Sequence, residues 1–265
     1  MGVPHVFKWR DVDPHTDFKW GGVKSGASHD GFSVPLTVRN NETGAYHEFV
    51  HLGPEIPQMA IPFGLKAKEG KFGTRYSADM TFPGVCRNEE GELVGDKELV
   101  DYCKWLQSIE DLNKKMAHEQ CKQWFGKELK PEIIEEFYFK SLSESSKPES
   151  YSPTLTTRLE HSGGAFKTKF FNQDGKEIKF EDITAGSRVI PLIKTLGLWF
   201  AGKSFGMSYK IVQMMVFERE QFDACVITNP YQPVVEETPD AISPAFNLPE
   251  KDLAEPGAKR QKVEA

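Results

Sequence analysis

The fold of this chain is decided by two neighbouring stretches, RVIPLIKTLGLWF at 188–200 and FGMSYKIVQMMVF at 205–217. Both are rich in β-branched and aromatic side chains, and from Phe205 onward large apolar residues occupy every second position except Gln213. The residues between them include Gly202 and Lys203, a composition that favours a tight turn. The sequence therefore predicts two long strands joined by a hairpin, with the basic Lys203 at its tip.

The same hairpin matches the phosphate-loop pattern G-x-x-x-x-G-K-[ST] over residues 197–204. A phosphate loop requires a helix directly after the motif, because the free N–H groups of the helix N-terminus hold the phosphates. Here the residues after Ser204 alternate as a strand does, and Leu-Trp-Phe-Ala at 198–201 favours a strand over an exposed loop. Nucleotide binding at this motif is therefore a distant third alternative.

Shorter strands are predicted on either side of a helical region. We expect strands at 32–38, where Pro35 allows only an edge strand, and at 46–52, 72–82, 154–160, 165–171 and 176–180. Apolar residues recur about every 3.6 positions over 96–125, with Asp96 placed to cap the helix and Gly126 placed to end it. A short helix begins at Pro131. This order predicts an α+β, mainly β domain rather than an alternating β-α-β fold.

Composition divides the chain into an N-terminal arm at 1–31, a domain at 32–229 with a helical insertion at about 96–140, and a tail at 230–265. Residues 231–255 contain six acids against one lysine, a net charge of −5, together with several prolines. We therefore expect a disordered acidic tail. The tail ends in a basic cluster, Lys259, Arg260 and Lys262, which is a candidate nuclear-import signal.

The composition also excludes several classes of protein. A net charge of −6 over 265 residues excludes a uniformly basic nucleic-acid coat, and no apolar stretch approaches the ~20 residues that cross a bilayer. We expect no secretory signal, and four scattered cysteines without a C-x-x-C pair indicate an intracellular protein. His47 and His51 lie on a predicted strand, about 13 Å apart, too far to share a metal. No catalytic motif is present, so we expect neither an enzyme nor a metal or cofactor.

Basic residues stand beside aromatic residues in three predicted strand regions. No acid occurs from 183 to 217, and similar clusters occupy 66–76 and 167–171. Cations that hold phosphates, next to rings that stack on unpaired bases, are what a single-stranded nucleic-acid platform requires. The candidate DNA-binding residues are Trp9, Lys66, Lys68, Lys71, Arg75, Tyr76, Lys167, Lys169, Trp199, Lys203, Phe205, Tyr209 and Lys210.

Strands, a long helix, closing strands and an acidic C-terminal extension resemble the layout of single-stranded DNA-binding proteins of short-tailed bacteriophages. The segments Leu198-Trp199-Phe200, Gly202-Lys203 and Gly206-Met207-Ser208-Tyr209-Lys210 are more similar to the OB-fold single-stranded DNA-binding proteins of nucleocytoplasmic large DNA viruses. The resemblance implies an OB-fold-like barrel that binds single-stranded DNA without sequence preference in viral DNA replication, recombination or repair. It also implies replication proteins as partners of the acidic tail. The tail departs from the phage pattern because it lacks a terminal aromatic residue.

The resemblance places the protein in the nucleus, the cytoplasm or a viral replication site of an infected host cell. The acidic tail is expected to compete with DNA for the same lysines. RNA stays open as an alternative ligand, because no feature of the sequence reports on the 2′-hydroxyl. The rival function is a protein-interaction scaffold without nucleic-acid binding, with the helix at 96–125 as its docking surface.

Overall fold

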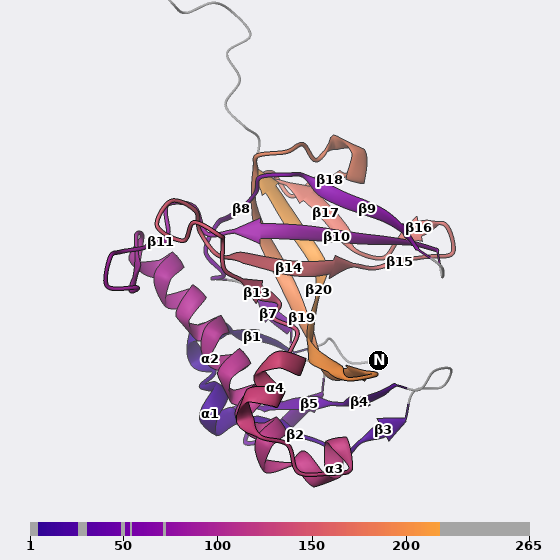
Figure 1. Ribbon diagram of the computed structural model, residues 1–265. Coiled ribbons are helices and arrows are strands. Elements are labelled where there is room, and N and C mark those ends of the chain that lie inside the picture. The colour runs from indigo at the N-terminus through magenta and orange to yellow at the C-terminus, as the bar shows by residue number, and fades with distance from the viewer. Residues whose placement is uncertain (1–4, 26–30, 49–50, 54, 71–72, 218–265) are drawn as a thin grey trace, which may run out of the picture. The chain divides into compact units, whose positions relative to one another are not determined.

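The computed structural model describes residues 5–25, 31–48, 51–53, 55–70 and 73–217 (Figure 1). These residues belong to the first of two compact units, Met1–Glu220. The predicted tail at 230–265, with its basic cluster, lies outside the described residues. None of the helices in the described part of the chain combines the length and apolar character needed to cross a bilayer.

The predicted hairpin is confirmed as the longest strand pair of the described structure. Strand β19 (Ser187–Ala201) and strand β20 (Ser204–Phe217) run antiparallel, and the turn between them contains Gly202 at a φ of 59°. The register shifts between Leu192 and Ile193 and again between Thr195 and Leu198. Irregularities of this kind increase the local twist of a strand pair. Figure 1 shows both strands extending well past their short neighbours.

Strand pairings around this hairpin close a ring. Strand β8 (Met59–Ile61) pairs with β19 and with β10 (Gly73–Thr81), and β10 pairs with β14 (Thr154–Leu159). Strand β14 then pairs in parallel with β20, which returns to β19. We call this closed set the strand ring. Met80, Leu155 and Ile211 are among the ring side chains that are fully buried inside it. Successive side chains of a strand point to opposite faces, so the neighbours of these residues point outward.

Further strands extend the ring at its margins. Strand β9 (Leu65–Gly70) pairs with β10, while β17 (Lys169–Asn172) and β18 (Glu177–Ile178) follow β20. Strands β7 (His51–Gly53) and β1 (Val6–Lys8) follow β19, which also pairs with β4 (Phe32–Val34) and through it with β3 (Lys24–Ser25). A separate sheet contains β2 (Phe18–Trp20), β5 (Leu36–Arg39) and β6 (Tyr46–Glu48). The small strands are β11 (Cys86–Arg87), β12 (Leu93–Val94), β13 (Leu142–Ser143), β15 (His161–Ser162) and β16 (Ala165–Phe166).

Two sequence predictions differ from the structure in the N-terminal region. The strand expected at 32–38 is interrupted at Pro35, which has no N–H to donate to a ladder. Within the predicted arm at 1–31, the described residues include β1, β2, β3 and the short helix α1 (Pro14–Asp17). The strands pair with β7, β5 and β4, so these residues are part of the folded unit.

The helical region forms α2 (Lys97–Glu119), α3 (Cys121–Phe125) and α4 (Pro131–Phe137). Asp96 caps α2 by accepting hydrogen bonds from the N–H groups of Glu98 and Leu99, and Gly126 ends α3 in a left-handed conformation. The apolar face of α2, which includes Leu106 and Ile109, is buried in the core. The rival scaffold function would therefore have to use the polar face of this helix.

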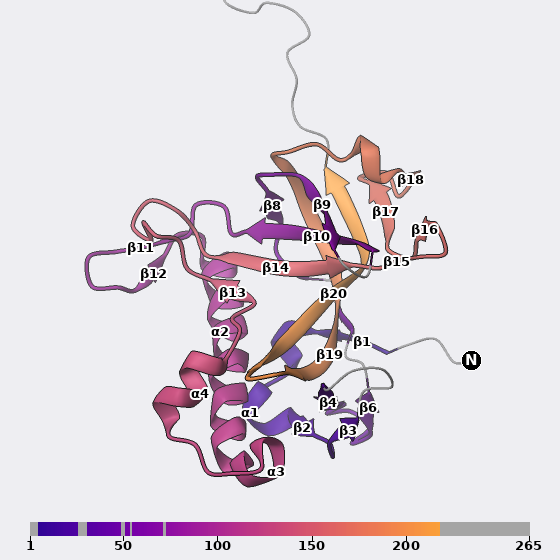
Figure 2. The same cartoon turned by 45° about the vertical axis from the view of Figure 1, so that its right-hand side comes forward.

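The turn end of the β19–β20 hairpin is surrounded by aromatic rings. Phe200 and Phe205 stack with their centroids 5.3 Å apart, and Phe205 also contacts Phe125 at 5.3 Å and Tyr138 at 5.2 Å. Phe200 contacts Trp124 at 5.5 Å. In Figures 1 and 2 this end of the hairpin lies near α3 and α4. The hairpin thus joins the strand ring to the helical region through an aromatic core.

Glu110 connects α2 to the strands through its buried carboxylate. Its Oε1 accepts hydrogen bonds from the N–H groups of Ser141 (2.8 Å) and Leu142 (2.9 Å), and the Ser141 hydroxyl donates to the carbonyl of Met207 at 2.6 Å. Burial raises the pKa of Glu110 to about 7, although the two backbone donors act in the opposite direction. Between about pH 4.5 and pH 7, the folded protein therefore keeps a proton on Glu110 that the unfolded chain has released.

We expect Glu110 to make the protein less stable as the pH rises from about 4.5 to about 7. In this range the native state binds more protons than the unfolded state, so the free energy of unfolding falls by at most about 1.4 kcal/mol per pH unit for this group. Glu110→Gln should flatten this dependence, since its carbonyl oxygen still accepts from Ser141 and Leu142. Urea unfolding at pH 5 and pH 8 measures the effect. The exposed Glu136→Gln serves as control, and an equal pH dependence in wild type and Glu110→Gln would contradict the assignment.

Candidate nucleic-acid interface

Cationic side chains form a line across β9 and the outside of the strand ring, interrupted only at Ser77 of β10. The register places Lys66 of β9 opposite Ser77 of β10, and Ser77 opposite Arg158 of β14. Arg158 in turn lies opposite Lys210 of β20, which lies opposite Lys194 of β19. Burial alternates in the parts of β14, β20 and β19 that carry the cations, with Thr157, Leu159, Tyr209, Ile211, Ile193 and Thr195 inside, so these cations share the outer face. We call Lys66, Arg158, Lys210 and Lys194 the cation row.

The cation row runs across the strands rather than along one of them. Neighbouring strands lie about 4.8 Å apart, so the row from β9 to β19 covers roughly 19 Å of the sheet. Figure 2 shows β9, β10, β14 and β20 following one another in this part of the molecule. Two further exposed cations, Lys68 and Arg75, face each other in the adjacent β9–β10 pair. The surface is therefore wide enough for several phosphates in sequence.

The two arginines of this surface are electrostatically unfavourable neighbours. Partial burial and the nearby positive charge of Arg75 lower the pKa of the Arg158 guanidinium from its ordinary value. Neither Arg75 nor Arg158 forms an ion pair with an acid among the described residues. An anion placed between them would relieve this repulsion, which makes this point of the surface favourable for a phosphate.

Acids neutralise part of the surface. Lys66 forms an ion pair with Asp79, Lys210 with Glu160 at 3.2 Å, and Lys169 with Glu177 at 2.5 Å. In each pair at least one side chain is well exposed, so each pair contributes little to stability and can be exchanged for a phosphate contact. Lysines already paired in this way gain less from DNA than the unpaired arginines.

The structure brings most of the predicted cations together. Lys66 and Lys210 belong to the cation row, and Lys68 and Arg75 lie beside it. Lys169 of β17 is opposite Gln213 of β20, while Lys167 is exposed just before β17. Lys203 stands at the hairpin turn, away from the row, and Lys71 lies outside the described residues.

Three of the predicted stacking residues are corrected by the structure because they are buried. Phe205 is 0% exposed and Tyr209 is 2% exposed, and both occupy the phase of β20 opposite to Lys210. A strand presents alternate residues to opposite faces, so these rings cannot share a surface with that lysine. Trp9 is 5% exposed, and its indole N–H donates to the carbonyl of Glu55 at 2.8 Å.

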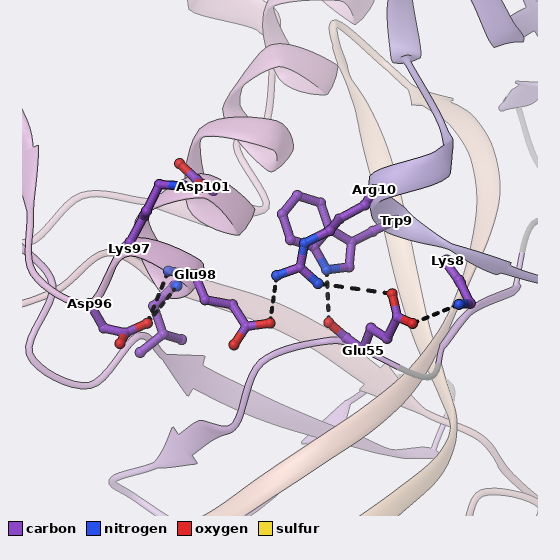
Figure 3. Close-up of polar contacts among 9 residues, drawn as sticks. Lys8, Trp9, Arg10, Glu55, Asp96, Lys97, Glu98 and Asp101 are labelled. Atoms are coloured by element: carbon purple, nitrogen blue, oxygen red, sulfur yellow. Dashed lines mark hydrogen bonds and ion pairs between the residues drawn. The ribbon is translucent and has the colours of Figure 1, made fainter.

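Figure 3 shows the surroundings of Trp9. Arg10 lies over the indole ring, 4.6 Å from its centroid, and pairs with Glu98 at 2.6 Å, while Lys8 pairs with Glu55 at 2.7 Å. The indole therefore fastens the N-terminal residues to Glu55, and Arg10 fastens them to the start of α2. Because Trp9 is buried and covered by Arg10, it offers no ring face to a base.

Tyr76 and Trp199 are partly buried. Tyr76 contacts the rings of His161, Phe166 and Phe180 at centroid distances of 4.8, 4.8 and 5.6 Å. Trp199 lies against Phe139 at 5.9 Å, near the turn of the hairpin. Both residues are engaged with other rings, and neither belongs to the cation row.

Sequence analysis missed Arg158 and did not assign Lys194 to the site. Arg158 stands alone in a short strand, without a neighbouring basic or aromatic residue, so no cluster marked it. The alternation Leu155, Thr157, Leu159 did place it on the polar phase of that strand. Only the pairing of β14 with β10 and β20 shows that it lies between Lys66 and Lys210.

The phosphate-loop match at 197–204 forms a β-hairpin, as the alternation predicted. Strand β20 begins directly at Ser204, so no helix N-terminus follows the lysine. We expect Lys203→Ala to weaken oligonucleotide binding less than about threefold, as is typical for one exposed cation. We also expect no ATP hydrolysis that depends on Lys203. A coupled ATPase assay on wild type and variant tests this, and Lys203-dependent turnover would restore the nucleotide-binding alternative.

Comparison with known proteins gives one family and several structural neighbours. A model described as a family of unknown function, DUF5871, matches residues 88–229. No curated protein matches the sequence. The structure is similar to gp2.5, a single-stranded DNA-binding protein of bacteriophage T7, with a TM-score of 0.37 and 12% identity over 64% of this chain and 88% of that chain.

A second neighbour is the single-stranded DNA-binding protein of bacteriophage Enc34. Its TM-score is 0.34 with 9% identity over 80% of this chain and 96% of that chain. The same protein in complex with single-stranded DNA has a TM-score of 0.33 with 13% identity over 76% and 98% of the two chains. Both neighbours are single-stranded DNA-binding proteins of bacteriophages.

Proposed function

The chain belongs to this family of unknown function, DUF5871, and we propose that it is a binding protein for single-stranded DNA that does not select a sequence. The observation that carries the proposal is the cation row, which crosses five neighbouring strands and includes Arg158, a residue with no acid partner among the described residues. Contacts between cations and phosphates hold a nucleic acid without reading its bases. We therefore assign the chain a binding role rather than an enzymatic one.

We also propose that the strand ring is an OB-fold-like barrel into which the region of α2, α3 and α4 is inserted. Supporting this, the ring consists of five strands, and its hairpin β19–β20 closes it. OB-folds bind oligonucleotides on the face of their second and third strands and with the neighbouring loops. Counted along the chain from β8 with its continuation β9, these strands are β10 and β14, which carry Arg75 and Arg158.

The preference for single strands follows from the shape of the contact. A line of cations across a curved sheet follows one flexible backbone, which can bend to each cation in turn. A duplex is stiff over this distance and presents two backbones. Affinity for a single strand should fall with salt, with a slope of log K against log [salt] of about −0.7 for each phosphate contact.

An electrophoretic mobility-shift experiment tests the proposed function. Equal lengths of single-stranded DNA, duplex DNA and single-stranded RNA are titrated with the protein at two salt concentrations. We expect the single-stranded DNA to bind more tightly than the duplex and to lose affinity at the higher salt. Equal affinity for single-stranded and duplex DNA, or an affinity that does not change with salt, would contradict the proposal. Tighter binding of RNA than of single-stranded DNA would make RNA the ligand.

For the cell, we propose a role in viral DNA replication, recombination or repair, at a replication site in the nucleus or cytoplasm. The acidic sequence at 231–255 supports two further parts of this proposal, contact with replication proteins and competition with DNA for the lysines. Lys259, Arg260 and Lys262 are proposed as the import signal.

A further inference from the structure

Phe63 is a large apolar side chain in an unusual position. It is 69% exposed, the largest exposed fraction among the large hydrophobic residues of the described chain. It stands in the turn between β8 and β9, where the N–H of Gly64 donates to the carbonyl of Ile61 at 3.1 Å. Gly64 has a φ of +67°, a conformation that favours glycine.

The turn that carries Phe63 is held in place. Ile61 is fully buried, and its carbonyl also accepts a hydrogen bond from the N–H of Gly186 at 2.8 Å. Gly64 lies against Ala185, so the segment before β19 supports the turn from behind. An exposed ring on a fixed backbone needs little ordering when a ligand binds, which favours binding.

Phe63 adjoins the end of the cation row. The ammonium group of Lys66, the row's member on β9, lies 5.3 Å from the centroid of the Phe63 ring. Lys66 also pairs with Asp79 on β10. One cation thus joins the exposed ring to the surface that is proposed to hold phosphates.

The other well-exposed aromatic residues have different surroundings. Phe139 lies against Trp199 at 5.9 Å, and Tyr46 has Lys19 over its ring at 5.4 Å. Tyr151 is 62% exposed and has no described contact with a member of the cation row. Among the described residues, only Phe63 combines high exposure with a contact to the row.

We propose that Phe63 is the platform on which a base of the bound single strand stacks, at the β9 end of the cation row. This inference rests on the proposed DNA-binding function. Lys66 turns from the ring towards a phosphate, and an unpaired base covers the ring face that becomes free. Stacking tolerates every base because each has a π-face, so Phe63 adds affinity without sequence preference. A duplex has its bases already stacked on one another, so Phe63 also favours the single strand.

Phe63→Ala tests the proposal because it should remove the contribution of base stacking to affinity and leave the phosphate contacts in place. We expect binding of a single-stranded oligonucleotide to fall about five- to 150-fold, the range for loss of one base–aromatic stack. The slope of log K against log [salt] should stay unchanged, because no phosphate contact is removed. Phe63→Tyr should keep the affinity and Phe63→Leu should lose it. The matched control is Tyr151→Ala, which removes an equally exposed ring and should bind as the wild type does.

An oligonucleotide without bases separates stacking from other effects. On a fully abasic strand, wild type and Phe63→Ala should bind equally, through the cation row alone. A loss on the abasic strand equal to the loss on normal DNA would overturn the inference, as would unchanged affinity of Phe63→Ala for normal DNA. In both outcomes salt-dependent binding by the wild type would leave the proposed function standing. Absence of such binding in the wild type would instead overturn the proposed function.

Discussion

Replacing Lys66, Arg158 and Lys210 together with alanine is expected to weaken single-stranded DNA binding by roughly 100-fold at low salt. The three cations come from β9, β14 and β20 and face the same surface. Each exposed ionic contact contributes at most about 1 kcal/mol, and the three are far enough apart to act almost independently. The salt slope should become shallower by about 2, since three phosphate contacts at about 0.7 each are lost. Fluorescence anisotropy titrations at several salt concentrations measure both quantities.

The control for this variant removes the same charge elsewhere. Lys104, Lys122 and Lys127 are exposed on or next to the helices α2 and α3, and none lies on the strand ring. Their triple alanine variant should bind with nearly wild-type affinity and with an unchanged salt slope. If both triple variants lose affinity equally, the net charge of the protein attracts DNA and the cation row has no special role.

Within the row, Arg158 is expected to contribute most to the loss. Lys66 and Lys210 must first give up their ion pairs with Asp79 and Glu160, whereas Arg158 has no acid partner among the described residues. A phosphate at Arg158 also offsets the repulsion from Arg75 that lowers its pKa. The single alanine variants, titrated in the same way, give this order.

Phe205→Ala is expected to lower the free energy of unfolding by about 3–5 kcal/mol. The Phe205 ring is fully buried and contacts the rings of Phe200, Phe125 and Tyr138 at 5.2–5.3 Å. Removing it leaves a cavity where the hairpin meets the helical region, and rigid neighbours fill such a cavity only in part. Urea unfolding followed by circular dichroism measures the change.

Phe139→Ala is the matched control for this loss of stability. Phe139 is exposed, and its backbone N–H donates to the carbonyl of Phe205 at 2.7 Å, a bond that the substitution keeps. We expect a change of less than about 1 kcal/mol. A Phe205→Ala protein with wild-type stability but weakened DNA binding would contradict the buried position. Phe205 would then again be a candidate for stacking on bases.

Local features of this fold were predictable because they depend on neighbouring residues. Alternation over 188–217 predicted the β19–β20 hairpin, and the same alternation predicted that the phosphate-loop match would not form a phosphate loop. Asp96 and Gly126 marked the ends of the helical run over α2 and α3 through their capping chemistry. The phase of β20 even separated Tyr209 from Lys210, although the clustering of aromatic and basic residues in the sequence suggested a common surface.

The sequence by itself thus determined the β19–β20 hairpin and the extent of the helical region, because these follow from the periodicity and capping of neighbouring residues. Only the tertiary structure decided which basic residues meet. Long stretches of chain separate Lys66, Arg158 and the hairpin that carries Lys194 and Lys210, and strand pairing with its register brings them into one row. The same packing buried Trp9 and Phe205 and left Phe63 exposed, since burial of a ring depends on what the rest of the chain places over it.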